Sequence, residues 1–114
     1  MPEEKINIPE WKANTTHPEL AGELREAFRD VKDPEIGSDI IQLGLVRDVE
    51  ISDEQVIVTM ILTTPYCPYG PVLLESARRI AKDTTGKKAT VIYGSEVWDQ
   101  SMMEDPSAFN WGLF

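Results

Sequence analysis

The sequence predicts a small α/β (α+β) fold: a mixed three-stranded sheet with two helices in the order α-β-β-α-β, followed by an irregular C-terminal tail. Three observations support this prediction. The chain has 114 residues, the size of one ordinary domain. Apolar residues recur at helical spacing in two stretches and follow strand patterns in three others. One strand, a helix and another strand follow closely, which predicts a right-handed crossover between parallel strands.

The N-terminal part predicts an arm and then a helix. Residues 1–15 are polar and contain two prolines, so we expect an extended arm that Trp11 holds to the body. Thr16 and Glu19 have the spacing of a capping box, which predicts that a helix begins there. We expect this helix to end at residues 32–34, because a residue before proline is pushed out of the helical region. Its expected apolar face comprises Leu20, Leu24, Ala27, Phe28 and Val31.

A connection and a hairpin come next. Residues 33–44 are too rich in turn residues for a strand but carry apolar anchors, and loops of this kind often have a function. Residues 45–51 alternate between apolar and polar side chains, as in a half-buried strand. Residues 55–62 are apolar and β-branched, as in a central strand, and the short turn before them predicts a hairpin.

The second helix follows a rigid loop. Residues 63–71 contain three prolines and a glycine, which excludes regular structure there. Pro71 suits the first turn of a helix, and Gly86 suits a left-handed cap at its end. Residues 89–93 form the third predicted strand. The expected buried face of the second helix comprises Leu73, Ala77, Ile80 and Ala81.

Charge and composition exclude several classes of function. The formal net charge is −9, which repels phosphate backbones, so we expect no nucleic-acid partner. We expect no membrane association and a cytoplasmic location, because there is no apolar run of about twenty residues and no secretion leader. One cysteine and one histidine exclude an internal disulfide and a zinc site built from several of either. The basic stretch 78–88 is either a solvated helix end or a docking patch for an acidic partner.

Cys67 is the first candidate for chemistry. It lies between prolines ahead of a helix N-terminus, where the helix dipole and unpaired N–H groups favour the thiolate. A thiolate attacks electrophiles or binds soft metals. The alternative is a buried cysteine that acts as a small apolar residue.

Acidic and hydroxyl residues are secondary candidates. The carboxylates of Asp33, Glu35 and Asp39 could serve as hard ligands or general bases. Taken alone, they are better explained by a turn that opens at Asp33 and by side chains that face water. Thr63 and Thr64 could cap the loop or donate a hydrogen bond to a sulfur ligand.

Five short blocks in this order resemble the SufT/PaaD-like family of iron–sulfur cluster assembly factors, known for metal–sulfur cluster biosynthesis. The blocks are DPEI at 33–36, DI at 39–40, LGLV at 43–46, TTPYCP at 63–68, and Trp98 with Met102. The resemblance covers about residues 19–105. It implies an assembly domain over residues 16–105, with an aromatic tail over residues 106–114.

The resemblance implies a protein-maturation factor, not an enzyme, that carries, delivers or helps insert iron–sulfur clusters through Cys67. It implies a supporting site of Asp33, Glu35, Thr63 and Thr64, and partners in the assembly machinery and among client apoproteins. Exposed sheet edges and surplus aromatic residues predict a homodimer, and the alternative is a monomer whose tail covers its own sheet.

The single thiol leaves alternatives open. One soft ligand is too few for a standard four-cysteine cluster site, so a transient cluster or iron would be shared with a second subunit or a partner. The alternative function is a metal-free adaptor that binds assembly factors or clients through the same loop. A thiol-dependent enzyme is a weaker third hypothesis, because no base for it is evident.

Overall fold

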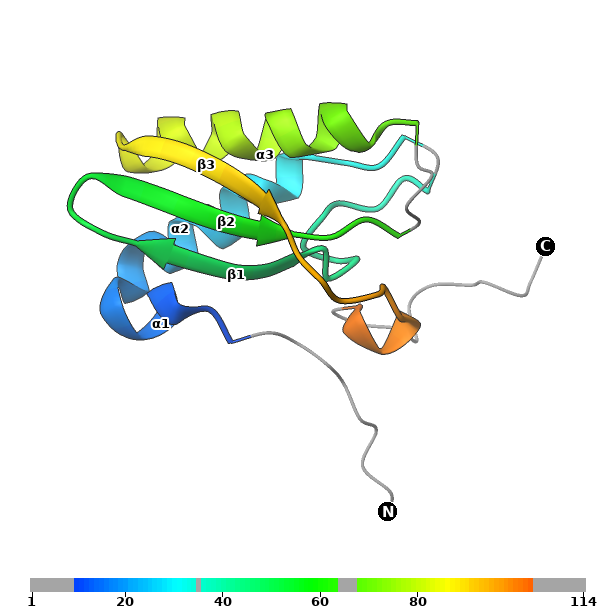
Figure 1. Cartoon of the computed structure of the whole chain (residues 1–114), viewed down its shortest axis with the longest axis horizontal. Helices are drawn as coiled ribbons and strands as arrows, with labels where there is room; N and C mark the ends of the chain where they lie inside the picture. The colour runs from blue at the N-terminus through cyan, green and yellow to red at the C-terminus, as the bar shows by residue number, and fades with distance from the viewer. Residues whose placement is uncertain (1–9, 35, 64–67, 104–114) are drawn as a thin grey trace, which may run out of the picture.

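The structure is a computed structural model, and it describes residues 10–34, 36–63 and 68–103. Figure 1 shows a twisted three-stranded sheet with helices α2 and α3 behind it and the short helix α1 beside β1. The predicted order α-β-β-α-β is confirmed, with shorter helices added to it. The elements are α1 (Lys12–Thr16), α2 (Pro18–Ala27), η1 (Phe28–Asp30), β1 (Val46–Ile51), β2 (Gln55–Met60), α3 (Gly70–Thr85), β3 (Lys88–Tyr93) and η2 (Gln100–Met102).

The sheet has the order β1-β2-β3, with β2 in the centre as expected. β1 pairs with β2 in the antiparallel sense, which confirms the hairpin, and β2 pairs with β3 in the parallel sense, which confirms the crossover. The register of β1 on β2 shifts between Val46 and Asp48. The carboxyl ends of β2 and β3 therefore lie at one edge of the sheet, where ligands of such sheets commonly bind.

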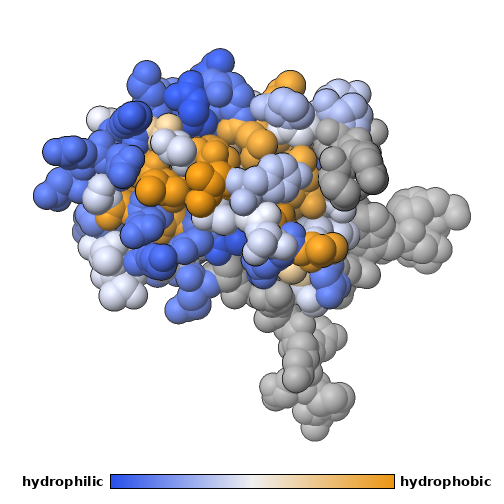
Figure 2. All heavy atoms as spheres, in the orientation of Figure 1, coloured by the Kyte–Doolittle hydropathy of each residue, from blue (hydrophilic) through white to orange (hydrophobic). Residues whose placement is uncertain are grey.

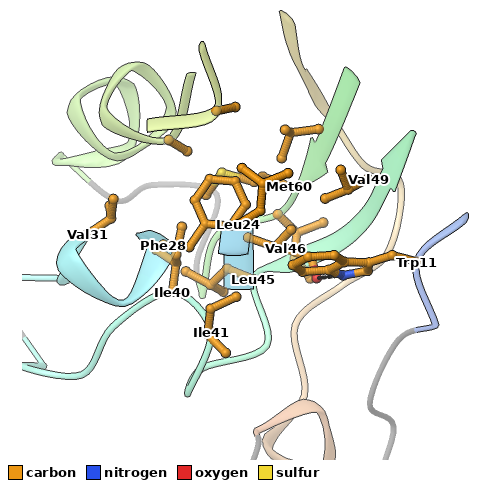
Figure 3. Packing of buried hydrophobic residues seen from close by; sticks show 14 of the residues in the cluster. Trp11, Leu24, Phe28, Val31, Ile40, Ile41, Leu45, Val46, Val49 and Met60 are labelled. Carbon is orange, nitrogen blue, oxygen red and sulfur yellow. Dashed lines mark hydrogen bonds between the residues drawn. The ribbon is translucent and has the colours of Figure 1, made fainter. Parts of the chain in front are cut away.

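One apolar core lies between the sheet and its helices (Figure 3). On the inner face of β2, Val56, Val58 and Met60 are fully buried. Each fully buried side chain of this size contributes roughly 1.5–3 kcal/mol of transfer free energy. The helices contribute buried residues to the same core, and Ile80 and Val91 pack against it partly buried. The buried residues of α2, η1 and α3 in this core include Leu24, Phe28, Leu73, Ala77 and Ala81.

The N-terminal arm corrects the sequence prediction. The expected extended arm over residues 1–15 is wrong for its last part, because residues 12–16 form helix α1. This short helix is held by tertiary contacts, since Trp11 and Ala13 are buried and the Lys12 N–H donates to Asp48 Oδ1 at 2.9 Å. Residues 1–9 lie outside the described part of the chain.

The predicted helix boundaries also need correction. Thr16 is the last residue of α1, so it does not cap α2, whose N-cap is His17 and has no side-chain capping hydrogen bond. α2 ends at Ala27 and continues as the 3-10 turn η1, several residues before Pro34. The boundaries of α3 agree better: Pro71 lies in its first turn, and Gly86 ends it with φ of 71°.

Candidate functional site

The candidate site surrounds a loop whose central residues the structure does not describe. Cys67, Thr64 and Glu35 lie outside the described residues, whereas Thr63 and Asp33 lie within them. The loop leaves the sheet after β2 and leads into α3. In Figure 1, the end of β2, the start of α3 and the connection that carries Asp33 lie at the same end of the molecule.

Two glycines hold the flanks of this loop close to the body. A Cβ atom at Gly70 would lie 2.6 Å from Leu62 Cδ1, so a larger residue at the start of α3 would have to displace the Leu62 side chain. A Cβ atom at Gly94 would lie 3.0 Å from Ile61 Cγ2, and the Gly94 N–H donates to the Met60 carbonyl at 2.7 Å. Both neighbours of the Cys67 loop, the end of β2 and the start of α3, are therefore anchored.

The N-terminus of α3 favours negative charge near the loop. Its N-cap residue, Tyr69, makes no side-chain capping hydrogen bond, and Pro71 follows in the first turn. The first N–H groups of a helix carry partial positive charge and attract anions. Cys67 lies three positions before Gly70 in the sequence but outside the described residues, so its thiolate form stays a prediction.

A small pocket adjoins the same flank. Its volume is about 150 Å³, and its walls come from the lead-in of the Cys67 loop and from the chain just after β3. Most of the wall is apolar, and Thr63, Tyr93 and Glu96 are among the lining residues that carry polar side-chain atoms. The pocket has room for about one apolar side chain of a bound protein. Its lining residues are Ile61, Leu62, Thr63, Tyr93, Glu96, Val97 and Trp98.

Asp33 is buried at this end of the molecule, with 1% of its surface exposed. Its N–H donates to the Ser38 carbonyl, and its own carbonyl accepts from Ile36 and Gly37, which confirms that a turn opens here. No buried side-chain oxygen or nitrogen in the described residues lacks a hydrogen-bond partner. Aspartate is rarely buried without a specific role for its carboxylate, so Asp33 stays a candidate for the site.

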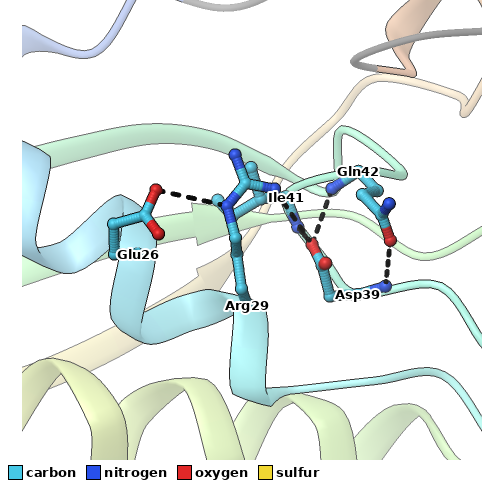
Figure 4. A network of polar contacts seen from close by, with 5 residues as sticks. All are labelled: Glu26, Arg29, Asp39, Ile41 and Gln42. Atoms are coloured by element: carbon cyan, nitrogen blue, oxygen red, sulfur yellow. Dashed lines mark hydrogen bonds and ion pairs between the residues drawn. The ribbon is translucent and has the colours of Figure 1, made fainter.

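Asp39 has a structural role (Figure 4). Its Oδ1 accepts from the Ile41 and Gln42 N–H groups at 2.9 and 2.8 Å, and Gln42 Oε1 accepts in return from the Asp39 N–H. This reciprocal pattern is a capping box around one turn. Arg29 lies 3.9 Å from the same carboxylate oxygen. The expectation that Asp39 faces water is therefore wrong: it is 6% exposed because it caps the turn.

Sequence reasoning missed Arg47, whose position in an alternating strand indicated a solvent-facing side chain. Its side chain is 5% exposed; Nε donates to Glu96 Oε1 at 2.9 Å, and Nη1 donates to the Gly44 carbonyl at 3.1 Å. The register shift between Val46 and Asp48 places Arg47 at the irregularity, which explains why alternation failed there. The ion pair holds Glu96 in the wall of the pocket.

The chain after β3 is clamped over the turn before β1. Trp98 Nε1 donates to the Leu43 carbonyl at 2.7 Å. Gly44 has φ of +74°, and a Cβ atom there would collide with the Met102 carbonyl. The LGLV block and the Trp98 and Met102 block, distant in sequence, are thus in direct contact.

The described residues contain neither a group of side chains suited to bind a metal ion nor a helix suited to span a membrane. Within residues 10–34, 36–63 and 68–103, no group of three or more His, Cys, Asp or Glu side chains could hold a metal ion. No helix in these ranges has the length and apolar character needed to cross a bilayer.

Comparison with known proteins places this chain in a family. A model of the family described as iron-sulfur cluster assembly protein matches residues 22–92. The Fe-S protein maturation auxiliary factor YitW of Bacillus subtilis is 34% identical over 87 residues, which are 75% of this chain and 83% of YitW. The auxiliary factor SufT of Staphylococcus aureus is 38% identical over 76 residues, 64% of this chain and 86% of SufT.

A longer relative and two solved structures extend the comparison. An iron-sulfur cluster carrier protein of Synechocystis is 33% identical over 68% of this chain, but the match covers 22% of that protein. A domain of unknown function from Bacillus anthracis has the same fold, with a TM-score of 0.72 and 23% identity over 82% of this chain and 92% of its own. A conserved hypothetical protein from Thermotoga maritima has a TM-score of 0.66 and 32% identity over 76% of this chain and 87% of its own.

Proposed function

Because the chain belongs to the family of iron–sulfur cluster assembly proteins, we propose that it carries an iron–sulfur cluster or iron and helps insert it into client proteins through Cys67. The cluster is cargo on this proposal, bound for a short time and passed on. The observation that carries the proposal is the loop that holds the only cysteine of the chain, between two flanks anchored by Gly70 and Gly94. The names of the relatives, maturation factors and a cluster carrier, support the same role.

Cys67 would contribute the soft ligand. The N-terminus of α3 favours a thiolate near it, and iron in clusters is held by thiolates. One thiolate cannot complete the four-ligand shell of a standard cluster. The remaining ligands would come from a second subunit, a partner or small thiols. Asp33, Glu35, Thr63 and Thr64 would support the site with charge and hydrogen bonds.

A homodimer would bring a second Cys67. The support for it is the edge strand β3, which pairs only with β2 among the described residues and in which Ile92 and Tyr93 are 47% and 54% exposed. Antiparallel pairing of two whole β3 strands would separate the two loops by roughly a strand length, about 20 Å. A shared cluster therefore favours contact through the carboxyl ends of β3 and through Val97, beside the pocket. Light scattering over a range of concentrations tests this, and Tyr93→Lys should convert a dimer to a monomer.

The cellular setting follows from the same proposal. The partners would be assembly factors and client apoproteins in the cytoplasm, and the protein would act without turning over a substrate of its own. The pocket beside the Cys67 loop would receive an apolar side chain of such a partner. Val97, at the pocket wall, is 84% exposed and available for contact.

Anaerobic reconstitution tests the proposal. The full chain is incubated with iron, sulfide and a small thiol, and the protein-bound chromophore is measured after gel filtration. We expect a chromophore in the parent protein and in Thr84→Ser, a conservative control on α3, but none in Cys67→Ser. Circular dichroism of Cys67→Ser should match that of the parent, so that loss of the fold does not explain the result.

Maturation of client enzymes in cells distinguishes the two functions that the sequence left open, the cluster carrier and the metal-free adaptor. If Cys67→Ser binds no cluster but still supports maturation of client enzymes in cells, the loop acts as an interaction surface and the metal-free adaptor takes the place of the carrier. If the variant loses both properties, the carrier function holds.

A further inference from the structure

A second surface lies at the far end of α3. A pocket of about 620 Å³ opens where the helix turns into β3, and four cationic side chains line it. All five basic residues of the C-terminal half of the chain fall within residues 78–88. The lining residues are Arg78, Lys82, Asp83, Gly86, Lys87, Lys88 and Ala89, which we call the basic pocket.

Two of these cations are available to a ligand. Lys82 and Lys88 are exposed, and neither makes an ion pair with a residue in the described part of the chain. Arg78 donates to Glu75 at 2.6 Å, and Lys87 Nζ donates to the Asp53 carbonyl at 2.9 Å. The pocket thus combines two cations that hydrogen bonds hold in place, Arg78 and Lys87, with two exposed cations, Lys82 and Lys88.

The helix dipole does not account for this cluster. Cations stabilise the last turn of a helix, and Lys82 is the basic residue in that turn of α3. Lys87 and Lys88 lie beyond it, around the turn at Gly86 and at the start of β3. Gly86 leaves the turn open, because a Cβ atom there would have no atom within 4 Å. The surface is a hollow with cations from two elements.

We propose that the basic pocket binds an acidic segment of a partner protein, a short stretch of Asp or Glu side chains. Charge complementarity supports this occupant, since the pocket is a local basic site on a chain with a net charge of −9. Four cations and one carboxylate, that of Asp83, belong to the residues that line the pocket. The Debye length at physiological salt is about 8 Å, so a short peptide there responds to these residues more than to the acidic residues farther away.

A nucleic acid fits this surface poorly. α2 packs beside α3 and carries exposed acidic residues at helical spacing, Glu19, Glu23 and Glu26. Double-stranded DNA has one charge per about 1.7 Å, so a duplex that reached beyond the pocket would meet these carboxylates. A second copy of the chain fits poorly as well. Binding of its acidic α2 face to the basic pocket would be head-to-tail, and contacts of this kind form open chains of subunits.

The basic pocket is separate from the Cys67 loop. α3 has 16 residues, and at about 1.5 Å per residue the pocket lies roughly 20 Å along the helix from the loop. A partner could hold the basic pocket while the Cys67 loop stays accessible. The proposal does not depend on cluster binding, and its test uses a different measurement.

Fluorescence anisotropy with the full chain tests the proposal. The probe is a labelled peptide of alternating Glu and Gly, and the control probe has Gln in place of Glu. We expect the Glu peptide to bind and the Gln peptide not to bind. The double variant Lys82→Glu, Lys88→Glu should weaken binding by about tenfold or more, because it opposes like charges.

Matched variants make the test specific. Lys32→Glu makes the same kind of charge reversal at an exposed lysine outside the pocket and should leave the affinity unchanged. Equal loss of affinity in Lys32→Glu would mean that net charge alone attracts the peptide, and the proposal would be wrong.

Stronger binding of a short DNA duplex than of the Glu peptide would assign the pocket to nucleic acid. Self-association that Lys82→Glu abolishes would assign it to a second copy. Cluster reconstitution is unaffected by any of these outcomes.

Discussion

The two edges of the sheet differ in how they are covered. Along β1, Trp11 is 2% exposed and α1 lies beside the strand, while Arg47 and Glu96 tie the chain after β3 across its start. Along β3, among the described residues, the only strand that pairs is β2, and Ile92 and Tyr93 stay about half exposed. Figure 2 shows the resulting apolar area over β2 and β3 on the face turned to the viewer.

The difference indicates where this protein stabilises itself and where it meets others. Covering β1 uses two segments from opposite ends of the described chain, at Trp11 and at Glu96. Natural edge strands are usually protected by charges or prolines, and in β3 the one such residue is Lys88 at its start, while residues 89–93 contain neither. We therefore expect substitutions on the β1 side to change the stability of the monomer, and those on the β3 side to change its contacts.

The largest effect should come from Trp11→Ala. The Trp11 ring packs edge-to-face on Phe28 at 6.2 Å, lies 4.1 Å from the Arg25 guanidinium, and donates through Nε1 to the Val46 carbonyl. Loss of a buried aromatic residue costs about 3–5 kcal/mol. Urea unfolding followed by circular dichroism measures it. Tyr93→Ala, on the edge strand β3, is the control and should cost less than about 1 kcal/mol. Equal losses of unfolding free energy in the two variants would contradict the difference between the two edges of the sheet.

Gly44→Ala should come next. A side chain at residue 44 is strained by the positive φ and would push the chain at Met102 away from the turn before β1. We expect a loss of about 2 kcal/mol or more in the free energy of unfolding. Gly22→Ala is the control: its Cβ atom would meet no atom within 4 Å, and alanine in α2 should stabilise by about 0.5–1 kcal/mol. A neutral Gly44→Ala would mean that the clamp over β1 is not needed.

Glu96→Gln should have a smaller effect of about 1 kcal/mol, because a charged hydrogen bond to a buried guanidinium is weakened while shape is kept. Glu50→Gln, on β1, is the matched control, because it makes the same substitution at another ion-paired glutamate. Glu50 is 56% exposed and lies 3.9 Å from Lys12, so Glu50→Gln should reduce the free energy of unfolding by less than Glu96→Gln does. Chemical denaturation of both variants under one condition decides the order. The reverse order would show that the exposed pair matters more than Arg47.

The smallest effect concerns Glu75 on the exposed face of α3. The hydrogen bond from Arg78 lowers the pKa of the Glu75 carboxyl from its usual value. Because the folded pKa is the lower one, this pair stabilises the fold above the unfolded pKa and loses its effect as the pH falls through the folded pKa. An NMR titration should give a lower midpoint for Glu75 in the parent than in Arg78→Gln. The midpoints of the other glutamates should stay the same. Identical Glu75 midpoints would mean that the bond does not persist in solution.

Much of the fold could be predicted because it rests on local patterns. Apolar spacing identified both main helices and the three strands, and Gly86 has the predicted left-handed conformation. The candidate site stays a prediction. Asp33 is buried and Thr63 lines the small pocket, but no contact of the described residues tests a role for Cys67, Asp33, Glu35, Thr63 or Thr64.

The remaining features were decided by contacts between residues far apart in the chain. Helix α1 has too few residues to be stable alone, and it forms because Trp11 and Lys12 bind β1. Arg47 is buried because a register shift turns it toward Glu96, 49 positions away. Local spacing carries the periods of helices and strands, so the sequence by itself determined those elements. Burial of a charge or of a short arm depends on which partners the fold brings together, and only the tertiary structure decided that.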